Sequence, residues 1–278
     1  STPSSLRKAM DIVRTLASAG SQGMRASALC RELGTTPATT HRLLQQLIAE
    51  DLVEQPPGGR HYRLSLGLFT LAARAGDQAG LRSLCRPALI RLGAALGDSL
   101  FLLVRAGFDA VCLDRWEGPF PVRTFTGDIG GRIPIGVGQG ALCILAYLPM
   151  AEQEEIMRFN VPRIRHMGPI DEVFLRTEIL RVQTQGFANT NMGVIEGMAG
   201  VAVPLFDTQG RVVGALSVGT LANRLSAERL PVVVELLQRE ARSLSSRINP
   251  FDPTLRRPAE SLGAMTLSPS LGLQEPSQ

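Results

Sequence analysis

The chain has 278 residues, of which 44% are hydrophobic and 19% charged, a balance typical of globular proteins with room for two domains. Its formal net charge is +4, and most of this charge lies within residues 1–80, which fits contact with nucleic acid. No apolar run approaches the roughly 18 residues of a membrane span and no apolar leader is present, so we expect a cytoplasmic protein with no membrane partner.

Cysteines and histidines are few and widely spaced. The four cysteines form no CxxC pair, and the three histidines are dispersed. This spacing favours reduced, mostly buried thiols over a disulfide framework or a zinc site, and we expect neither a metal nor a cofactor. The cysteines are Cys30, Cys85, Cys112 and Cys143.

Two helices are predicted at the start of the chain. The first runs from Leu6 to Ser18, with Ser5 as its cap and apolar residues at helical spacing on one face. The second is shorter, runs from Arg25 to Leu33 and ends at Gly34.

The clearest motif is the next stretch, GTTPATTHRLLQQLIAE, which spans residues 34–50. Thr36 can cap a helix and Pro37 suits its first turn. One face of this helix is apolar, and the other carries hydroxyl, amide and guanidinium groups that suit phosphates and base edges in a major groove. That polar face consists of Thr39, Thr40, Arg42, Gln45 and Gln46. Two helices joined by a tight turn predict a helix-turn-helix.

A short hairpin is predicted directly after this helix. Residues 52–55 and 61–64 have the character of strands, and residues 56–59 have the composition of a turn. A hairpin in this position is a wing, and its tip carries two side chains placed to contact the DNA backbone or a minor groove. The predicted DNA-binding residues are Arg25, Thr36, Thr39, Thr40, Arg42, Gln45, Arg60 and His61.

Plainer interpretations stay open for this region. Residues 34–50 also fit an amphipathic helix with a solvated polar face, and Arg42 could pair with Glu50 or Asp51 within the chain. We favour DNA binding because the short helix, the glycine turn and the hairpin occur in the order that a winged helix-turn-helix requires.

The remaining chain reads as one α+β domain. A connector helix over residues 66–79 and a helix over residues 81–96 precede a change from helical to extended spacing at residue 99. Strands are predicted over residues 99–105, 110–115, 116–126, 199–206 and 212–220. Helices are predicted over residues 139–148, 150–159, 171–185 and 226–247, the first of them after a glycine-dense loop. Strands paired mainly as hairpins indicate a mostly antiparallel sheet with helices against it.

Three stretches, taken in order, carry a family likeness. They are residues 37–53 with 58–72 (PATTHRLLQQLIAEDLV and GGRHYRLSLGLFTLA), 131–149 (GRIPIGVGQGALCILAYLP) and 185–225 (QGFANTNMGVIEGMAGVAVPLFDTQGRVVGALSVGTLANRL). Together they resemble the isocitrate lyase regulator (IclR) family of bacterial transcription factors. The resemblance implies an N-terminal DNA-binding domain and a C-terminal effector domain similar to a GAF domain. It also implies dimers or dimers of dimers that repress or activate catabolic operons, often for organic or aromatic acids.

This resemblance suggests four parts. Residues 1–66 form the winged helix-turn-helix domain and residues 67–80 the helical connector. Residues 81–248 form the GAF-like domain for effector binding and oligomerisation. Residues 249–278, rich in Pro, Ser and Leu without periodicity, are expected to be a disordered tail.

The chain also departs from the family pattern. By the likeness, Thr39 and Arg42 match residues placed on DNA, although Ala38 stands where serine is common. Gly136 and Gly138 replace a usual histidine and a small hydroxyl residue, and residues 192–193 lack the frequent acidic side chains. We therefore expect a roomier, less polar pocket, and an aromatic or acyl effector larger than a two- or three-carbon acid.

The predicted effector site is the junction of the glycine-dense loop with the helix that follows. Small residues let a ligand approach the backbone, and N–H groups at a helix N-terminus favour a carboxylate. The alternative is that these glycines serve turn geometry alone. The predicted effector-binding residues are Gly136, Val137, Gly138, Gln139, Gly140, Ala141, Met192 and Ser217.

The predicted function is regulation of a catabolic operon. We expect a homodimer or tetramer that binds a pseudo-palindromic operator in double-stranded DNA and responds to a small organic acid. The alternative is a DNA-binding protein whose C-terminal domain only dimerises. An enzyme is disfavoured, because no GxSxG, no HExxH and no phosphate-binding GxGxxG occurs, and we assign no catalytic residue.

Overall fold

The computed structural model describes residues 4–68, 71, 80–119, 128–189 and 195–249. The chain divides into two compact units, Ser1–Gln78 and Ala79–Gln278. Each unit has its own apolar core, so each is described by itself.

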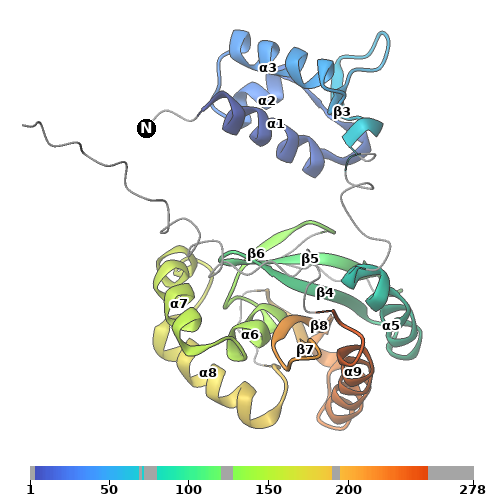
Figure 1. The fold of residues 1–278 in the computed structure, drawn as a ribbon, viewed down its shortest axis with the longest axis vertical. Helices are drawn as coiled ribbons and strands as arrows, with labels where there is room; N and C mark the ends of the chain where they lie inside the picture. The colour runs from blue at the N-terminus through green and yellow to red at the C-terminus, as the bar shows by residue number, and fades with distance from the viewer. Residues whose placement is uncertain (1–3, 69–70, 72–79, 120–127, 190–194, 250–278) are drawn as a thin grey trace, which may run out of the picture. The chain divides into compact units, whose positions relative to one another are not determined.

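The N-terminal unit packs helices against a three-stranded sheet (Figure 1). Its helices are α1 (Ser5–Ala19), α2 (Ala26–Glu32) and α3 (Pro37–Ala49). Its antiparallel strands, in the order β1-β3-β2, are β1 (Met24–Arg25), β2 (Val53–Glu54) and β3 (His61–Leu64). The pair β2–β3 is the predicted wing. Strand β1 was not predicted, because two residues are too few to show a period.

Side-chain caps set where these helices begin. The Thr36 hydroxyl accepts a hydrogen bond from the Thr39 amide, so Thr36 caps α3 as predicted. Helix α1 begins one residue earlier than predicted, because Ser4 rather than Ser5 accepts from the Arg7 amide. Ile12 of α1 and Leu44 of α3, both fully buried, belong to the core that joins the helices.

The C-terminal unit contains a five-stranded antiparallel sheet in the order β6-β5-β4-β8-β7. The strands are β4 (Ser99–Ala106), β5 (Asp109–Trp116), β6 (Arg132–Pro134), β7 (Met198–Phe206) and β8 (Val212–Leu221). The helices are α5 (Leu81–Leu96), α6 (Gln139–Ala146), α7 (Met150–Ile164), α8 (Glu172–Gln185) and α9 (Arg229–Ser245). The predicted α+β class with a mostly antiparallel sheet is confirmed.

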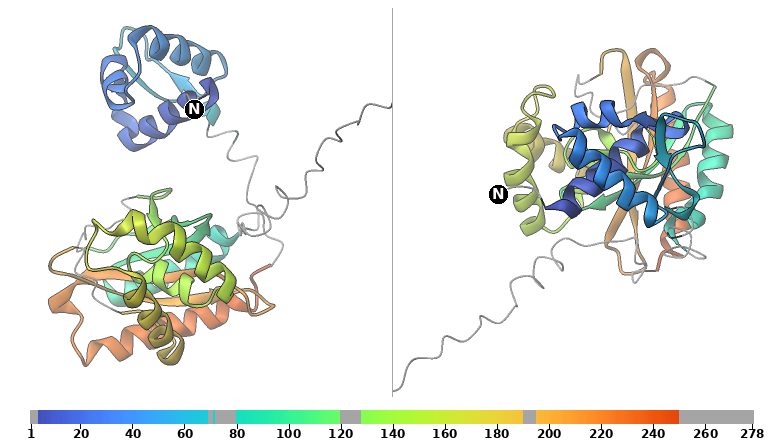
Figure 2. Two further views of the ribbon diagram at one scale, coloured as in Figure 1. Left: turned by 90° about the vertical axis from the view of Figure 1, so that its left-hand side faces the viewer. Right: turned by 90° about the horizontal axis from the view of Figure 1, so that it is seen from above.

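The sheet lies between two apolar cores. Helices cover both of its faces (Figure 1 and Figure 2). Helices α5 and α9 cover the face that carries Leu100 and Leu102 of β4. Helix α6 covers the opposite face, and α7 and α8 lie outside it. Because side chains alternate along a strand, Phe101 and Leu103 of β4 point to this second face. We call this second face the inner face, and it carries Phe101, Leu103, Ala202 and Ala215.

An irregularity in β5 changes which of its side chains reach the inner face. Leu103 pairs with Cys112, but Leu102 pairs with Asp114, so β5 contains one extra residue. Such a β-bulge reverses the alternation beyond it. Arg115 therefore lies opposite Phe101 on the inner face, while Asp114 turns toward α5 and accepts a hydrogen bond from Arg86 at 3.1 Å.

Some boundaries differ from those predicted. Strand β6 lies within the segment predicted as a loop, because its three residues are too short for a visible alternation. Helix α7 continues past residue 159 to Ile164, whose buried side chain joins the inner core. Helix α9 begins at Arg229, whose amide donates to the Ser226 hydroxyl at 3.2 Å. Three predicted segments lie wholly or partly outside the described residues: residues 120–126 of the predicted strand, most of the connector and residues 250–278 of the tail.

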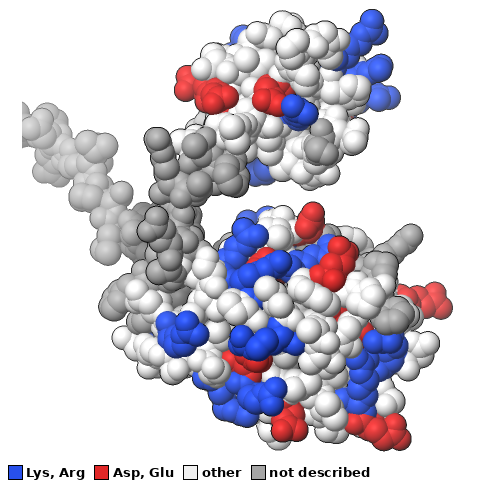
Figure 3. Space-filling view, turned by 90° about the vertical axis from the view of Figure 1, so that its right-hand side faces the viewer, with Lys and Arg blue, Asp and Glu red and all other residues white. Residues whose placement is uncertain are grey.

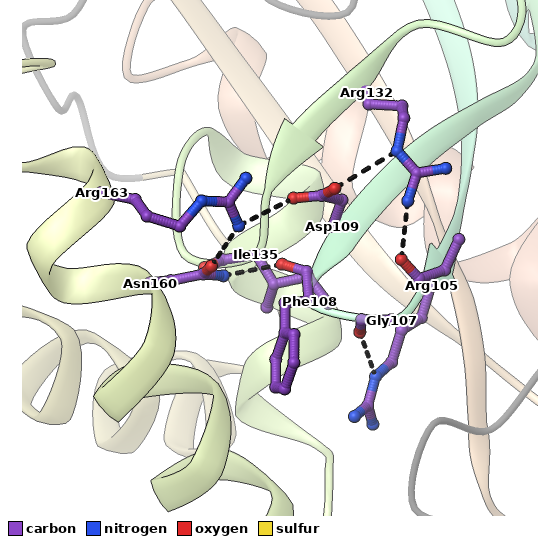
Figure 4. A network of polar contacts seen from close by, with 9 residues as sticks. Arg105, Gly107, Phe108, Asp109, Arg132, Ile135, Asn160 and Arg163 are labelled. Carbon is purple, nitrogen blue, oxygen red and sulfur yellow. Dashed lines mark hydrogen bonds and ion pairs between the residues drawn. The ribbon is translucent and has the colours of Figure 1, made fainter. Parts of the chain in front are cut away.

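A buried amide ties α7 to the loop that precedes α6. Asn160 is 0% exposed, and its Nδ2 donates to the carbonyl oxygens of Phe108 at 2.7 Å and Ile135 at 3.0 Å. Figure 4 shows Arg132 and Arg163 approaching the Asp109 carboxylate from two sides, each at 3.2 Å. The network thus sets the position of Ile135, the residue directly before the predicted effector loop.

Replacement of Asn160 by Leu should destabilise the C-terminal unit. The buried carbonyl of Ile135 would lose its donor, at a cost of about 1–3 kcal/mol for a group left unsatisfied. The Phe108 carbonyl would lose one donor and keep the Ile135 amide at 3.0 Å. We expect the midpoint of thermal unfolding, followed by circular dichroism, to fall by several degrees. Arg165→Gln, directly after the same helix and at an exposed position, should leave the midpoint unchanged. An unchanged midpoint in Asn160→Leu would show that these hydrogen bonds do not hold the loop.

Candidate functional site

The outer face of α3 presents polar side chains to solvent. Arg42 and Gln45 are exposed and Thr39 is partly exposed, as predicted for a face that reads DNA. Arg42 donates from Nη1 to Gln46 Oε1 at 3.3 Å, one turn further along the helix. This contact replaces the alternative of a pair with Glu50 or Asp51.

Threonine side chains order the beginning of this face. The Thr36 hydroxyl donates to Thr39 Oγ1 at 2.9 Å while it accepts from the Thr39 amide. Exposed His41 belongs to the same surface and was missed, although it stands four residues before Gln45, the spacing of neighbours on one helical face.

The prediction that Thr40 contacts DNA is wrong. Its side chain is 1% exposed, and its hydroxyl lies 2.6 Å from the hydroxyl of Thr35 in the turn before α3. Cys30 of α2 donates from its thiol to the Thr35 carbonyl at 2.6 Å. Thr40 therefore fixes the angle between the two helices of the motif instead of facing the groove.

The pairing of β1 with β3 brings two residues predicted to contact the DNA backbone together. In the β1–β3 pair, Arg25 lies opposite His61, and both side chains are exposed. Arg60 is exposed next to His61 at the start of β3, whereas Arg63 pairs with Glu54 at 2.6 Å. Figure 3 shows basic side chains projecting together from one edge of this unit. An exposed edge of this kind suits the sugar-phosphate backbone.

The second candidate site lies where α6 begins above the inner face. Gly136 and Gly138 have positive φ angles of +109° and +76°, so at these two positions turn geometry itself calls for glycine. Gly140 is helical, and a side chain there would overlap Leu103 and approach Ser217. Val137 and Ala141 are buried, and Gln139 is partly exposed.

Strand pairing places Ser217 close to this junction. Ser217 of β8 lies opposite Phe101 of β4 on one side and Ala202 of β7 on the other. Gln139 extends over β7, where a Cβ on Gly200 would lie 2.9 Å from Gln139 Oε1. The structure thus brings Gln139, Gly140 and Ser217 together, while Met192 lies outside the described residues.

Arg115 brings a positive charge to the same face, and sequence reasoning missed it. Its guanidinium carbon lies 5.7 Å from the centroid of the Phe101 ring, and it pairs with Glu117. Phe101 separates Arg115 from Ser217 along one row of the sheet. Alternation along the predicted strand would put Arg115 on the opposite face from Cys112, and the β-bulge reverses this.

Two of the buried thiols are held in their protonated, unreactive form. Burial raises the pKa of Cys85 to about 12 and raises the pKa of Cys143 still further, so both stay protonated. Among the residues that the structure describes, no group of three or more His, Cys, Asp or Glu side chains could hold a metal ion. No described helix has the length and apolar character of a membrane span.

Two family models together cover most of the chain. The IclR helix-turn-helix domain matches residues 5–57, and the bacterial transcriptional regulator IclR C-terminal domain matches residues 73–246. The chain belongs to the IclR family of bacterial transcriptional regulators. The family resemblance noted in the sequence is confirmed, and so is the presence of an N-terminal DNA-binding helix-turn-helix domain.

Individual relatives agree with this assignment. The probable transcriptional regulator SauR of Cupriavidus necator is 28% identical over 77% of this chain and 84% of its own length. An IclR regulator from Alicyclobacillus acidocaldarius shares the fold with a TM-score of 0.73 and 24% identity, over 87% of this chain and 97% of that one. An IclR homologue from Microbacterium hydrocarbonoxydans, solved with 4-hydroxybenzoate, has a TM-score of 0.73 and 22% identity, over 87% and 98% of the two chains.

Two neighbouring threonines of α3 should have separable roles. Thr40→Val removes the hydrogen bond to Thr35 and should lower the stability of the N-terminal unit by about 1 kcal/mol. Thr39→Val should leave stability nearly unchanged but weaken DNA binding, because its hydroxyl lies on the outer face. Thermal unfolding and fluorescence anisotropy with DNA would be measured on both variants. Equal effects of the two substitutions on both properties would contradict this division.

Proposed function

We propose that this regulator binds a pseudo-palindromic operator as a homodimer or tetramer and controls a catabolic operon in response to a small organic acid. The observation that carries DNA reading is the exposed polar face of α3 beside the basic wing, in a chain of the IclR family. One recognition helix covers only a half-site, so a paired arrangement on a symmetric operator supplies the affinity that a single copy lacks.

The DNA-contacting residues divide into those that recognise bases and those that bind the sugar-phosphate backbone. Arg42 and Gln45 read base edges, since a guanidinium or an amide can bond two atoms of one base. Thr36 and Thr39 bind phosphate near the N-terminus of α3, where the helix dipole favours negative charge. Arg60 and His61 of the wing, with Arg25 directly before α2, bind the DNA backbone and set the position of the protein on it without reading sequence.

The proposed effector site is the inner face beneath the first turn of α6. Arg115 supplies a cation for a carboxylate, Ser217 supplies a hydroxyl, and Phe101 between them supplies an apolar surface. This combination suits an aromatic or acyl acid, and the Microbacterium homologue with 4-hydroxybenzoate supports the same class of effector. Gly140 contributes by letting α6 approach the sheet closely.

The alternative function is a C-terminal unit that dimerises without sensing a ligand. Measurement of DNA binding with and without organic acids separates the two, because a unit that only dimerises gives the same affinity in both conditions. Glyoxylate or pyruvate preferred over every larger acid would instead contradict the proposed effector class.

Arg42→Ala should weaken binding to the operator about 10- to 100-fold while changing binding to unrelated DNA little. Arg60→Ala should weaken both to a similar degree and reduce the slope of log affinity against log salt by about 1. The operator would be selected from genomic fragments with the full-length protein, and binding followed by fluorescence anisotropy at several salt concentrations. Arg158→Ala on α7 serves as the control. If Arg42→Ala lowers the affinity for the operator and for unrelated DNA equally, Arg42 does not recognise a base.

Arg115→Gln should lower the affinity for an aromatic acid by about tenfold or more, because a charge-assisted hydrogen bond is lost. Benzoate binding would be measured by isothermal titration calorimetry, together with thermal unfolding of the variant. Arg165→Gln, which removes an exposed cation directly after α7, is the control and should bind benzoate normally. Normal binding by Arg115→Gln would remove this residue from the proposed site.

A further inference from the structure

Ser99 presents a buried hydroxyl that the fold itself does not satisfy. It is the first residue of β4, the central strand of the sheet, and it is 0% exposed. Its Oγ has no hydrogen-bond partner among the described residues. Buried hydroxyls in native proteins nearly always have a partner, so this atom is a candidate contact for a bound molecule.

The hydroxyl belongs to the inner face. Phe101 and Leu103 of the same strand face the core beneath α6, and alternation puts Ser99 on their side. Ser99 lies opposite Gly219 of β8, which in turn lies opposite Gly200 of β7. Ser99 is therefore the only one of the three that brings a side chain to this row.

The row lies next to the proposed effector site. Gln139 reaches over Gly200 at one end, as its distance of 2.9 Å from a Cβ placed there shows. Ser217 and Arg115 both lie opposite Phe101, two residues along β4 from Ser99. Diagonal neighbours of this kind are about 7–8 Å apart. A ligand with two polar groups can therefore contact the Ser99 hydroxyl and one of these neighbours at the same time.

We infer that Ser99 is a second hydrogen-bonding residue of the effector pocket, and that the effector carries an uncharged hydroxyl or carbonyl group in addition to its carboxylate. This inference rests on the proposed effector function. The carboxylate belongs near Arg115, because an ionised group needs a charged partner when it is buried. Arg105 of β4 lies on the same face and already pairs with Glu152 of α7. The neutral group belongs at Ser99, whose row offers a hydroxyl and two glycines.

The first test needs no ligand. Ser99→Ala removes a hydroxyl that the fold does not use, so the midpoint of thermal unfolding should stay the same or rise. Thr220→Val is the control, because the buried Thr220 hydroxyl donates to Asp98 at 2.8 Å and its loss should lower the midpoint. A fall in Ser99→Ala comparable to that in Thr220→Val would overturn the inference, since the hydroxyl would then serve the fold.

The second test compares benzoate with 4-hydroxybenzoate, which differ only in the para hydroxyl. The full-length protein should bind 4-hydroxybenzoate about 3- to 10-fold more tightly, and Ser99→Ala should bind the two acids equally. If both acids bind and the ratio of their affinities is the same in Ser99→Ala as in the unchanged protein, the role of Ser99 is overturned and the aromatic effector class is retained. Absence of binding to either acid at about 1 mM would overturn the proposed aromatic effector class together with this inference.

Discussion

The close approach of α6 to the inner face of the sheet is the contact on which the C-terminal unit depends. Gly140 has no side chain, so the first turn of α6 can rest against Leu103 and Ser217. Any larger residue would have to displace the end of the Leu103 side chain, because an added Cβ would overlap Leu103 Cδ1, and would disturb the packing of this core. The same contact brings the N-terminus of α6 within reach of polar side chains on the strands, so packing and ligand recognition depend on one geometry.

Buried polar groups then fix the segments around this contact. Asn160 holds the residue before the glycine loop, and Asp98 accepts hydrogen bonds from Thr220, Arg224 and Arg229 beyond the opposite end of the sheet. Such networks specify one arrangement because a partner lost from a buried polar group is costly. Ser99 differs from them, since its hydroxyl is buried on the same sheet without a partner among the described residues. This difference separates a group suited to a ligand from groups that serve the fold.

In the N-terminal unit, the buried Thr40 side chain helps to orient the exposed polar face of α3. The contact between Thr40 and Thr35, with the Cys30 thiol on the Thr35 carbonyl, sets the turn between α2 and α3. That turn orients the outer face with Arg42 and Gln45 as one rigid surface. Fixing these side chains in advance lowers the entropy lost when they meet a groove.

Much of the architecture could be predicted from local patterns. The period of apolar residues predicted α3 with its Thr36 cap. It also predicted α5 with the bounds that the structure shows, Leu81–Leu96. Periodicity and capping could be detected because each involves residues within a few helical turns of one another. The hairpin β4–β5 followed from alternation and a turn, and the family likeness followed from three ordered motifs. Thr40 was misplaced because it sits at the border of the apolar stripe, where spacing cannot say which side a short side chain takes.

The sequence by itself determined the helix-turn-helix, the wing and the α+β class, since each depends on short-range spacing. It also indicated the family, through the resemblance of three ordered stretches. Only the tertiary structure decided which side chains share the inner face. The β-bulge after Cys112 reverses the alternation and moves Arg115 to that face, and strand register places Ser99 in line with Gly219 and Gly200. The bulge appears only in the pairing of β4 with β5, and the register of Ser99 depends on β8, which is distant in the chain. A period along one strand records neither.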